Sequence, residues 1–150
     1  MRRIALAVAL VIVAACAKKD EAPPIVVPAP PAATIDPAAV AGTWNMQVMG
    51  ATSDSVLTTY TLTATAGTEG WVMSMPNRDP MTLRITVSGD SIMSETPEFQ
   101  SVLRKGVKVR TNSVFHLSGG NLTGTTTARY STTGADSVVM LRATGTRKPM

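Results

Sequence analysis

The 150-residue chain has few of the residues that build most catalytic and metal sites. It contains one histidine, one cysteine, two tryptophans, two tyrosines and two phenylalanines. A structural zinc site normally needs four nitrogen or sulfur ligands, so the composition excludes a conventional zinc site. A single cysteine also excludes an internal disulfide. We therefore expect neither a bound metal nor a cofactor.

An excess of charge of one sign is also missing. The formal net charge is +4, and loss of an N-terminal segment containing Arg2 and Arg3 would lower it further. Nucleic-acid-binding domains usually carry a strong basic stripe, so we expect no nucleic-acid partner. The apolar run from Ile4 to Val13 is too short for a transmembrane helix, which takes about 20 residues.

The clearest pattern that is present lies at the N-terminus. Arg2 and Arg3 precede the apolar run, and Val13-Ala14-Ala15-Cys16 ends it. A charged start, a short apolar stretch and a small-residue cleavage site are typical of an export signal. Val13-Ala14-Ala15-Cys16 resembles the lipobox of bacterial lipoproteins. The resemblance implies cleavage before Cys16 and attachment of lipid to that residue, which would become the membrane anchor.

Three segments follow from this pattern: a signal peptide at 1–15, a lipidated cysteine with a proline-rich linker at 16–39, and a domain at 40–150. Proline blocks helices and central strands, so the linker is expected to be an extended tether. Ala17, rather than aspartate, follows the cysteine, which is similar to lipoproteins sorted to the outer membrane. We expect a cell-envelope protein that faces the periplasm or the surface.

From Gly42 onward, apolar and polar residues alternate in short runs rich in threonine and valine, separated by glycine turns. A period of two is typical of an antiparallel sheet with one face in water. The pattern predicts an all-β domain of about eight strands: 42–49, 56–65, 70–75, 81–87, 91–96, 107–117, 122–130 and 137–146. A short helix at Pro37 to Ala41 is also expected, with Asp36 as its N-cap.

Consecutive short hairpins favour an up-and-down order, and eight strands can close into a barrel without exposed edges. Gly42-Thr43-Trp44 at the start of the first strand resembles the Gly-x-Trp motif of lipocalins, and the domain size and strand count are also similar. The second lipocalin motif, Thr-Asp-Tyr, has no counterpart in this chain. In lipocalins a late basic residue packs on the tryptophan, and the candidates here are Arg142 and Arg147.

The apolar faces of the predicted strands are rich in methionine, which is flexible and fills irregular gaps. In an open barrel these residues would line an adaptable pocket, and in a filled barrel they would complete the packing. We predict a monomeric protein that binds a small hydrophobic ligand through Trp44, Met46, Tyr60, Trp71 and Met73. The alternative is a structural or interaction module of the envelope with a filled barrel.

Two patterns in the sequence resemble parts of catalytic sites. Gly89-Asp90-Ser91-Ile92 resembles the Gly-Asp-Ser-Leu block of serine hydrolases, but it lies in mid-chain between two strands, and Ser113 stands where Asp-x-x-His would need an aspartate before His116. A hairpin turn is the stronger interpretation. The spacing of Glu95 and Glu98 suits a strand end better than an acid–base pair. We therefore expect no enzymatic activity.

The one basic cluster comprises Arg104, Lys105, Lys108 and Arg110. Such a cluster can contact anionic lipid headgroups or an acidic partner. The stronger interpretation is a charged outer face that keeps the barrel soluble and protects a sheet edge.

Overall fold

The computed structural model describes residues 34–149. The predicted signal peptide, Cys16 and most of the linker lie outside this range. The described chain begins with the short helix α1 (Pro37–Val40), in which the Asp36 carboxylate accepts a hydrogen bond of 2.9 Å from the Ala38 amide. The predicted helix and its N-cap are confirmed. No helix of the described part is long and apolar enough to cross a bilayer.

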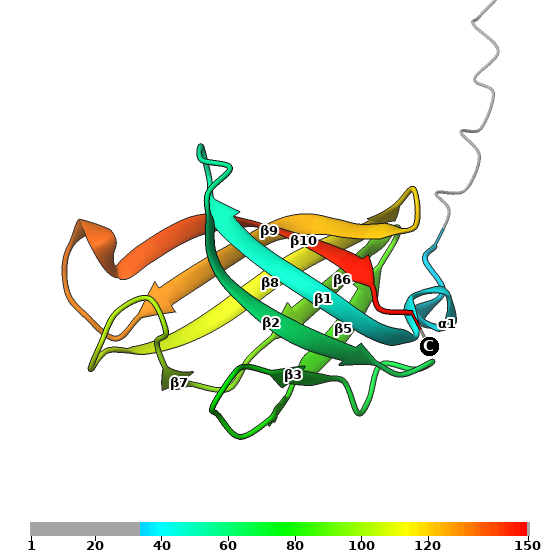
Figure 1. Ribbon diagram of the computed structural model, residues 1–150, viewed down its shortest axis with the longest axis horizontal. Coiled ribbons are helices and arrows are strands. Elements are labelled where there is room, and N and C mark those ends of the chain that lie inside the picture. The colour runs from blue at the N-terminus through cyan, green and yellow to red at the C-terminus, as the bar shows by residue number, and fades with distance from the viewer. Residues whose placement is uncertain (1–33, 150) are drawn as a thin grey trace, which may run out of the picture. The chain divides into compact units, whose positions relative to one another are not determined.

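Ten strand segments follow, and they form one antiparallel sheet (Figure 1). Their order in the sheet is β4-β3-β2-β1-β10-β9-β8-β6-β5, with β7 paired to β8. The strands are β1 (Gly42–Gly50), β2 (Val56–Ala64), β3 (Val72–Ser74), β4 (Met81–Thr82), β5 (Arg84–Ser88), β6 (Ser91–Glu95), β7 (Phe99–Gln100), β8 (Lys108–Ser118), β9 (Asn121–Tyr130) and β10 (Val138–Arg147).

The two ends of this sheet meet, because β4 and β5 belong to one stretch of chain that is interrupted only at Leu83. The Leu83 amide donates to the carbonyl of Trp71 at 2.9 Å, which continues the pairing of β4 with the chain before β3. The result is a nearly closed up-and-down barrel, as the sequence predicts. The predicted strand at 81–87 is divided in two, and the short β7 was not predicted.

The barrel has two unlike ends (Figure 1). We call the end that carries α1 the closed end, and the end that carries the connections β1–β2, β7–β8 and β9–β10 the open end. The larger buried cluster includes Val40 of α1 and reaches residues such as Trp44 and Leu122. The smaller cluster, which contains Val109 and Tyr130, lies towards the open end, where β8 begins and β9 finishes.

Close packing near the closed end depends on two glycines. A Cβ at Gly124 of β9 would overlap the Val114 carbonyl oxygen and lie 2.9 Å from the Phe115 ring. A Cβ at Gly145 of β10 would overlap the Met46 sulfur. Because neither residue has a side chain, Phe115 and Met46 can lie directly against the backbone of the neighbouring strands, and Phe115 and Met46 are 1% exposed.

Candidate functional site

A cavity of about 60 Å³ lies in the open half of the barrel. Its two walls differ in chemistry. The apolar wall is formed by the inward side chains of β1, β10 and the chain from β3 to β5, including Val48, Met73, Met75, Leu83 and Leu141. On the side formed by β6, β8, β9 and the residue after β6, the lining includes the apolar Val109 and Ala128. The same side carries the hydroxyl groups of five residues that we call the hydroxyl wall: Ser94, Thr96, Thr111, Ser113 and Thr126.

The hydroxyl wall is partly satisfied by its own hydrogen bonds. Ser113 Oγ and Thr126 Oγ1 are 2.8 Å apart, and Thr96 Oγ1 accepts from the Thr111 amide at 2.8 Å. Ser94 is also buried. No side chain that lines the cavity is charged. The cavity can therefore accept a neutral group that is apolar on one side and takes hydrogen bonds on the other.

The connection between β7 and β8 covers the cavity, and we call its residues 101–107 the mouth loop. Ser101 Oγ accepts from the amides of Leu103 at 3.1 Å and Arg104 at 3.0 Å, which fixes the turn. The Arg104 guanidinium lies 4.0 Å from the centre of the Tyr130 ring and donates to the Asp136 carbonyl at 2.8 Å. Leu103 lines the cavity and is still 38% exposed.

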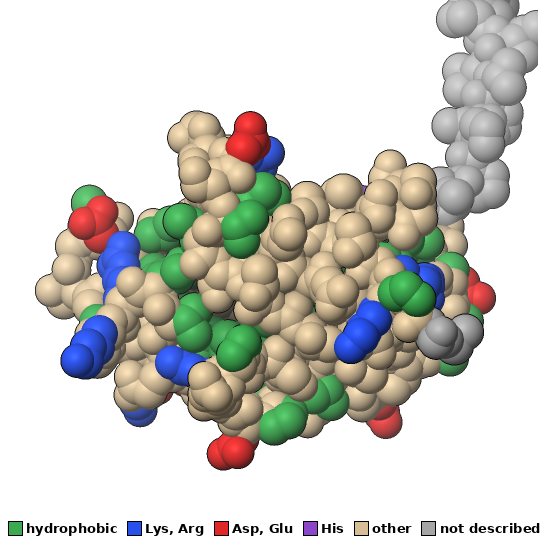
Figure 2. Space-filling model, in the orientation of Figure 1, with side chains coloured by type: hydrophobic (Ala, Val, Ile, Leu, Met, Phe, Trp, Pro, Cys, Tyr) green, Lys and Arg blue, Asp and Glu red, His purple; other side chains and the backbone are tan. Residues whose placement is uncertain are grey.

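Exposed apolar residues are concentrated around this open end. Hydrophobic side chains gather on the half of the visible face that lies towards it (Figure 2). The large exposed ones among the described residues come from the start of β2, the mouth loop and the start of β10: Val56, Leu57, Val102, Leu103, Val138 and Met140. Of these, Val102 and Leu103 line the cavity, and the others add apolar surface near the open end.

The five residues predicted to bind a ligand fall in three places. Tyr60 and Met73 line the cavity, and burial raises the pKa of the Tyr60 hydroxyl above its usual value. Met46 lines a separate groove beside β2. Trp44 and Trp71 are 0% and 1% exposed in the larger core cluster and do not line the cavity. The structure thus brings two of the five residues to the cavity.

Trp44 is instead the centre of the closed end. Its indole Nε1 donates to the Val40 carbonyl at 2.8 Å, and the Arg147 guanidinium lies 4.4 Å from the ring centre. Arg147 also donates to the carbonyls of Ala39, at 2.7 Å, and Ala41. Of the two candidate arginines, Arg147 is therefore the one that packs on Trp44. A Cβ at Gly42, where φ is +131°, would lie 2.9 Å from Nη1 of Arg147.

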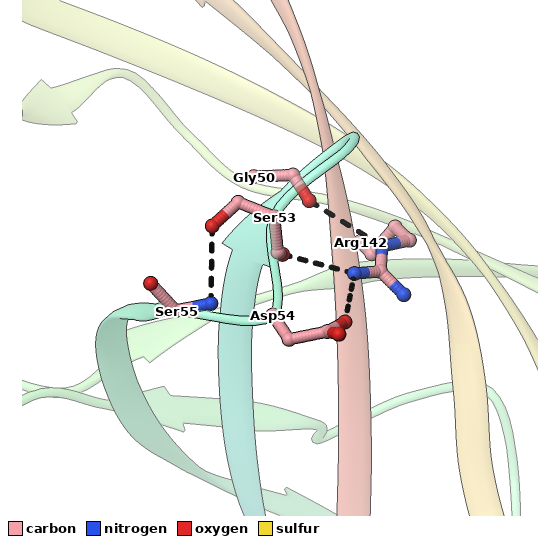
Figure 3. Close-up of polar contacts among 5 residues, drawn as sticks. All are labelled: Gly50, Ser53, Asp54, Ser55 and Arg142. Carbon is pink, nitrogen blue, oxygen red and sulfur yellow. Dashed lines mark hydrogen bonds and ion pairs between the residues drawn. The ribbon is translucent and has the colours of Figure 1, made fainter.

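Arg142 binds the β1–β2 connection at the other end of β10 (Figure 3). Its Nε donates to the Gly50 carbonyl at 3.3 Å, and its Nη2 donates to the Ser53 carbonyl at 2.9 Å and to Asp54 Oδ1 at 2.7 Å. These contacts hold a surface loop in place, and Arg142 does not line the cavity.

Asp90, Ser91 and His116 meet on the surface, but not as a catalytic triad. Ser91 Oγ lies 3.0 Å from Asp90 Oδ1 and 3.4 Å from His116 Nδ1, and that same nitrogen is 3.7 Å from the Asp90 oxygen. In a triad the serine and the acid bind opposite ring nitrogens. The chain turns tightly between Ser88 and Ser91, with Gly89 at a φ of +58°, so the hairpin-turn interpretation is confirmed.

Glu95 and Glu98 do not form a pair. The Glu95 carboxylate accepts a hydrogen bond of 2.7 Å from the side-chain amide of Asn112. Glu98 lies 3.2 Å from Lys108 Nζ and accepts from Ser131 at 3.0 Å. The hydrogen bond from Lys108, followed by that from Ser131, lowers the pKa of Glu98. Each carboxylate therefore has its own partners.

The four predicted contact residues lie on two elements. Arg104 and Lys105 belong to the mouth loop, and Lys108 and Arg110 are exposed on β8. Arg104 already contacts Tyr130 and Asp136, and Lys108 already forms an ion pair with Glu98. Within residues 34–149, no group of three His, Cys, Asp or Glu side chains could hold a metal ion.

The sequence analysis did not predict that the residues of the hydroxyl wall line a cavity, although strand alternation indicates that they face inward. Thr126 lies at an even position of β9 between Leu122 and Ala128, and all three are buried. Threonine is common on both faces of this sheet, so its residue type alone does not distinguish the inner face.

Comparison of the chain with protein-family models, with curated proteins and with solved structures finds no match.

Proposed function

We propose that the protein is a non-enzymatic binding protein of the bacterial cell envelope, anchored to a membrane by lipid on Cys16, that takes a small hydrophobic ligand in the open half of its barrel. The observation that supports this most directly is the cavity beneath the mouth loop, with Tyr60 and Met73 in its lining. The anchor is supported by the pattern from Arg2 to Cys16, and Ala17 favours the outer membrane.

The size of the cavity limits how a ligand can enter. A space of about 150 Å³ can hold benzene, whereas this cavity measures about 60 Å³. A larger ligand requires displacement of the mouth loop, which is held at its far side by the contacts of Arg104 with Tyr130 and Asp136. Burial of apolar ligand surface would supply about 25 cal/mol per Å² against this cost.

Native mass spectrometry of the full lipidated chain, extracted from its own envelope, tests the ligand directly. We expect a co-purifying hydrophobic molecule, and we expect Ser94→Leu, which places a short aliphatic group in the cavity, to lose it. Met140→Leu on the exposed side of β10 is the matched control and retains the ligand. A protein that carries no ligand, or a ligand that survives Ser94→Leu in a folded protein, would rule out the proposed site.

The anchor requires a separate test, because it does not depend on the cavity. Intact-mass analysis of the membrane fraction is expected to show a chain that starts at Cys16 and carries acyl groups, and metabolic labelling with palmitate is expected to mark it. Cys16→Ala abolishes both signals if the anchor is correct. An unmodified chain released into the soluble fraction would contradict the anchor and leave the ligand site untouched.

The alternative, an interaction module of the envelope, is favoured by the solid packing of the closed end and by the small volume of the cavity. Its contact surface would be the exposed apolar residues around the open end. Photo-crosslinking from Leu103, which is exposed in the mouth loop, distinguishes the two functions. A defined protein adduct with no bound small molecule supports the module, and a co-purifying ligand with no adduct supports the carrier.

A further inference from the structure

The first half of β2 has one edge without a neighbouring strand. β2 pairs with β1 along almost its whole length, but β3 pairs only with Thr61, Leu62 and Thr63. Among the described residues, no other strand or loop makes a backbone hydrogen bond to the segment 56–60. A free edge of this kind presents unpaired amide and carbonyl groups and is a template for an added strand.

The free edge borders a groove of about 510 Å³ on the outer side of the sheet. The groove lies where the chain after β3 turns away from β2, and it is lined by amide, hydroxyl and apolar groups. Its main polar residues are Asn45, Gln47, Thr59, Thr61 and Ser74, and none of its lining residues is charged. The segment 56–60 itself reads Val-Leu-Thr-Thr-Tyr, so the edge lacks the lysine or proline that commonly protects such edges.

The inner side of the same edge faces the cavity. Tyr60 and Met75 line both the outer groove and the inner cavity, and Thr58 lines the cavity. Side chains of a strand alternate between the two faces of its sheet. A strand added beside β2 would therefore direct alternate side chains towards Thr58 and Tyr60, where the cavity begins.

The cavity volume indicates which side chain fits. A single water needs roughly 10–15 Å³ of this measure, so about 60 Å³ has room for a short aliphatic group and not for a lipid tail or an aromatic ring. Met75 is flexible and lies between groove and cavity, which allows it to adjust around such a group.

We propose that the 56–60 edge of β2 binds an extended, uncharged peptide segment of a partner protein as an added strand, with one small aliphatic side chain in the cavity beside Met75. Main-chain hydrogen bonds would supply the affinity and the cavity would select the side chain. This function goes beyond small-ligand binding, because the partner is a polypeptide and the contact is the sheet edge.

The first test is a titration of the isotope-labelled full chain with the peptide Ac-Ser-Thr-Val-Thr-Ser-NH2, followed by amide NMR and hydrogen exchange. We expect saturable shifts at residues 56–60 and slower exchange of their edge amides. A peptide with N-methylated backbone, or with tryptophan in place of valine, is expected to bind at least about tenfold more weakly. The proposal fails if no saturable change occurs up to about 5 mM, or if the N-methylated peptide binds equally well.

The second test changes the shape of the cavity. Met75→Ala enlarges it, so this variant is expected to prefer the peptide with leucine in place of valine by about tenfold, whereas the unmodified chain prefers valine. Met140→Ala on β10, which does not line the cavity, is the matched control and leaves the preference unchanged. An unchanged preference in folded Met75→Ala would overturn the side-chain assignment.

A third variant covers the case in which Met75→Ala does not fold. Leu57→Lys adds a charge at an exposed position of the free edge and is expected to weaken the valine peptide about tenfold, since a charge beside the edge would oppose an uncharged strand. Thr125→Lys, at an exposed position of β9 that pairs with Val114 on one side and Arg142 on the other, is the control. Concentration-dependent pairing of the chain with itself through residues 56–60, which Leu57→Lys would abolish, would show that a second copy is the occupant and would contradict the proposal.

Discussion

The closed and open ends of the barrel are built from the same strands but differ in what their inner side chains meet. At the closed end Trp44, Phe115 and Leu122 are at most 1% exposed and contact other apolar groups. Towards the open end the inner positions include Ser113 and Thr126, which bind each other. Apolar burial stabilises a fold in proportion to area, whereas a buried hydroxyl only recovers the cost of its desolvation when it finds a partner.

This difference separates the solid core from the cavity along the barrel axis. The closed end is sealed by α1 and by Arg147, which donates to the carbonyls of Ala39 and Ala41. At the open end the mouth loop covers a cavity beside Tyr60 and Met73. Substitutions at the closed end should therefore lower the free energy of unfolding, and comparable substitutions at the open end should change it little.

The largest expected effect is that of Trp44→Ala. Removal of a fully buried tryptophan side chain is expected to lower the free energy of unfolding by about 3–5 kcal/mol, measured by urea denaturation with far-UV circular dichroism. Met140→Ala, at a position on β10 that is 52% exposed, is the control and should change it by no more than about 0.5 kcal/mol. Similar losses in the two variants would remove the distinction between the ends.

Gly124→Ala tests how tightly strand and ring are packed near the closed end. The new methyl group would meet the Val114 carbonyl and the Phe115 ring, and overpacking of this kind costs about 1–3 kcal/mol. The same denaturation measurement applies. Gly67→Ala, whose Cβ would have no atom within 4 Å, is the matched control, and equal midpoints for the two variants would show that Phe115 does not pack against β9 as described.

The two arginines of β10 allow the same comparison within one strand. Arg147→Met loses the contact with the Trp44 ring and the bonds to two carbonyls, so a loss of about 1–3 kcal/mol is expected. Arg142→Met loses the hydrogen bonds to the Gly50 and Ser53 carbonyls and an ion pair with an Asp54 that is almost fully exposed. These contacts hold a surface loop, so a smaller loss of about 1 kcal/mol or less is expected. Thermal unfolding measures both. A shift in the fluorescence of Trp44 is expected only for Arg147→Met, and a larger loss for Arg142→Met would reverse the assignment of the ends.

The sequence predicted the barrel well, because period two reports directly which face of a strand is buried. Most strand limits and the helix at Pro37 followed from residue type and parity. The sequence left both Arg142 and Arg147 open as partners of Trp44, and the structure selects Arg147. The break at Leu83 could not be predicted, since it arises where one stretch of chain changes its partner from β3 to β6, and alternation continues through it.

The site was predicted less well for a geometric reason. Parity shows that Trp44, Tyr60 and Trp71 point inward, but not how far along the barrel axis each residue lies. That depth depends on the stagger between strands, for example the pairing of Met46 with Tyr60 and of Trp44 with Leu62. Trp44 and Trp71 share the inward direction of the cavity residues, but their depth along the axis places them in the solid core.

The smallest expected effect concerns Glu98, on the chain between β6 and β7. Its pKa is lowered from the usual 4.5 by the hydrogen bonds from Lys108 and Ser131, so its charged form is favoured in the folded protein. A lowered folded-state pKa contributes stability that is complete above the unfolded value and is lost as the pH falls through the folded value. Glu98→Gln should therefore be slightly less stable than the unmodified chain at neutral pH, and the difference should disappear below pH 4.5.

Lys108→Met should remove most of the same pH dependence, because Lys108 is the principal partner. A difference between Glu98→Gln and the unmodified chain that stays constant from neutral to acid pH would mean that the carboxylate is not held by these bonds.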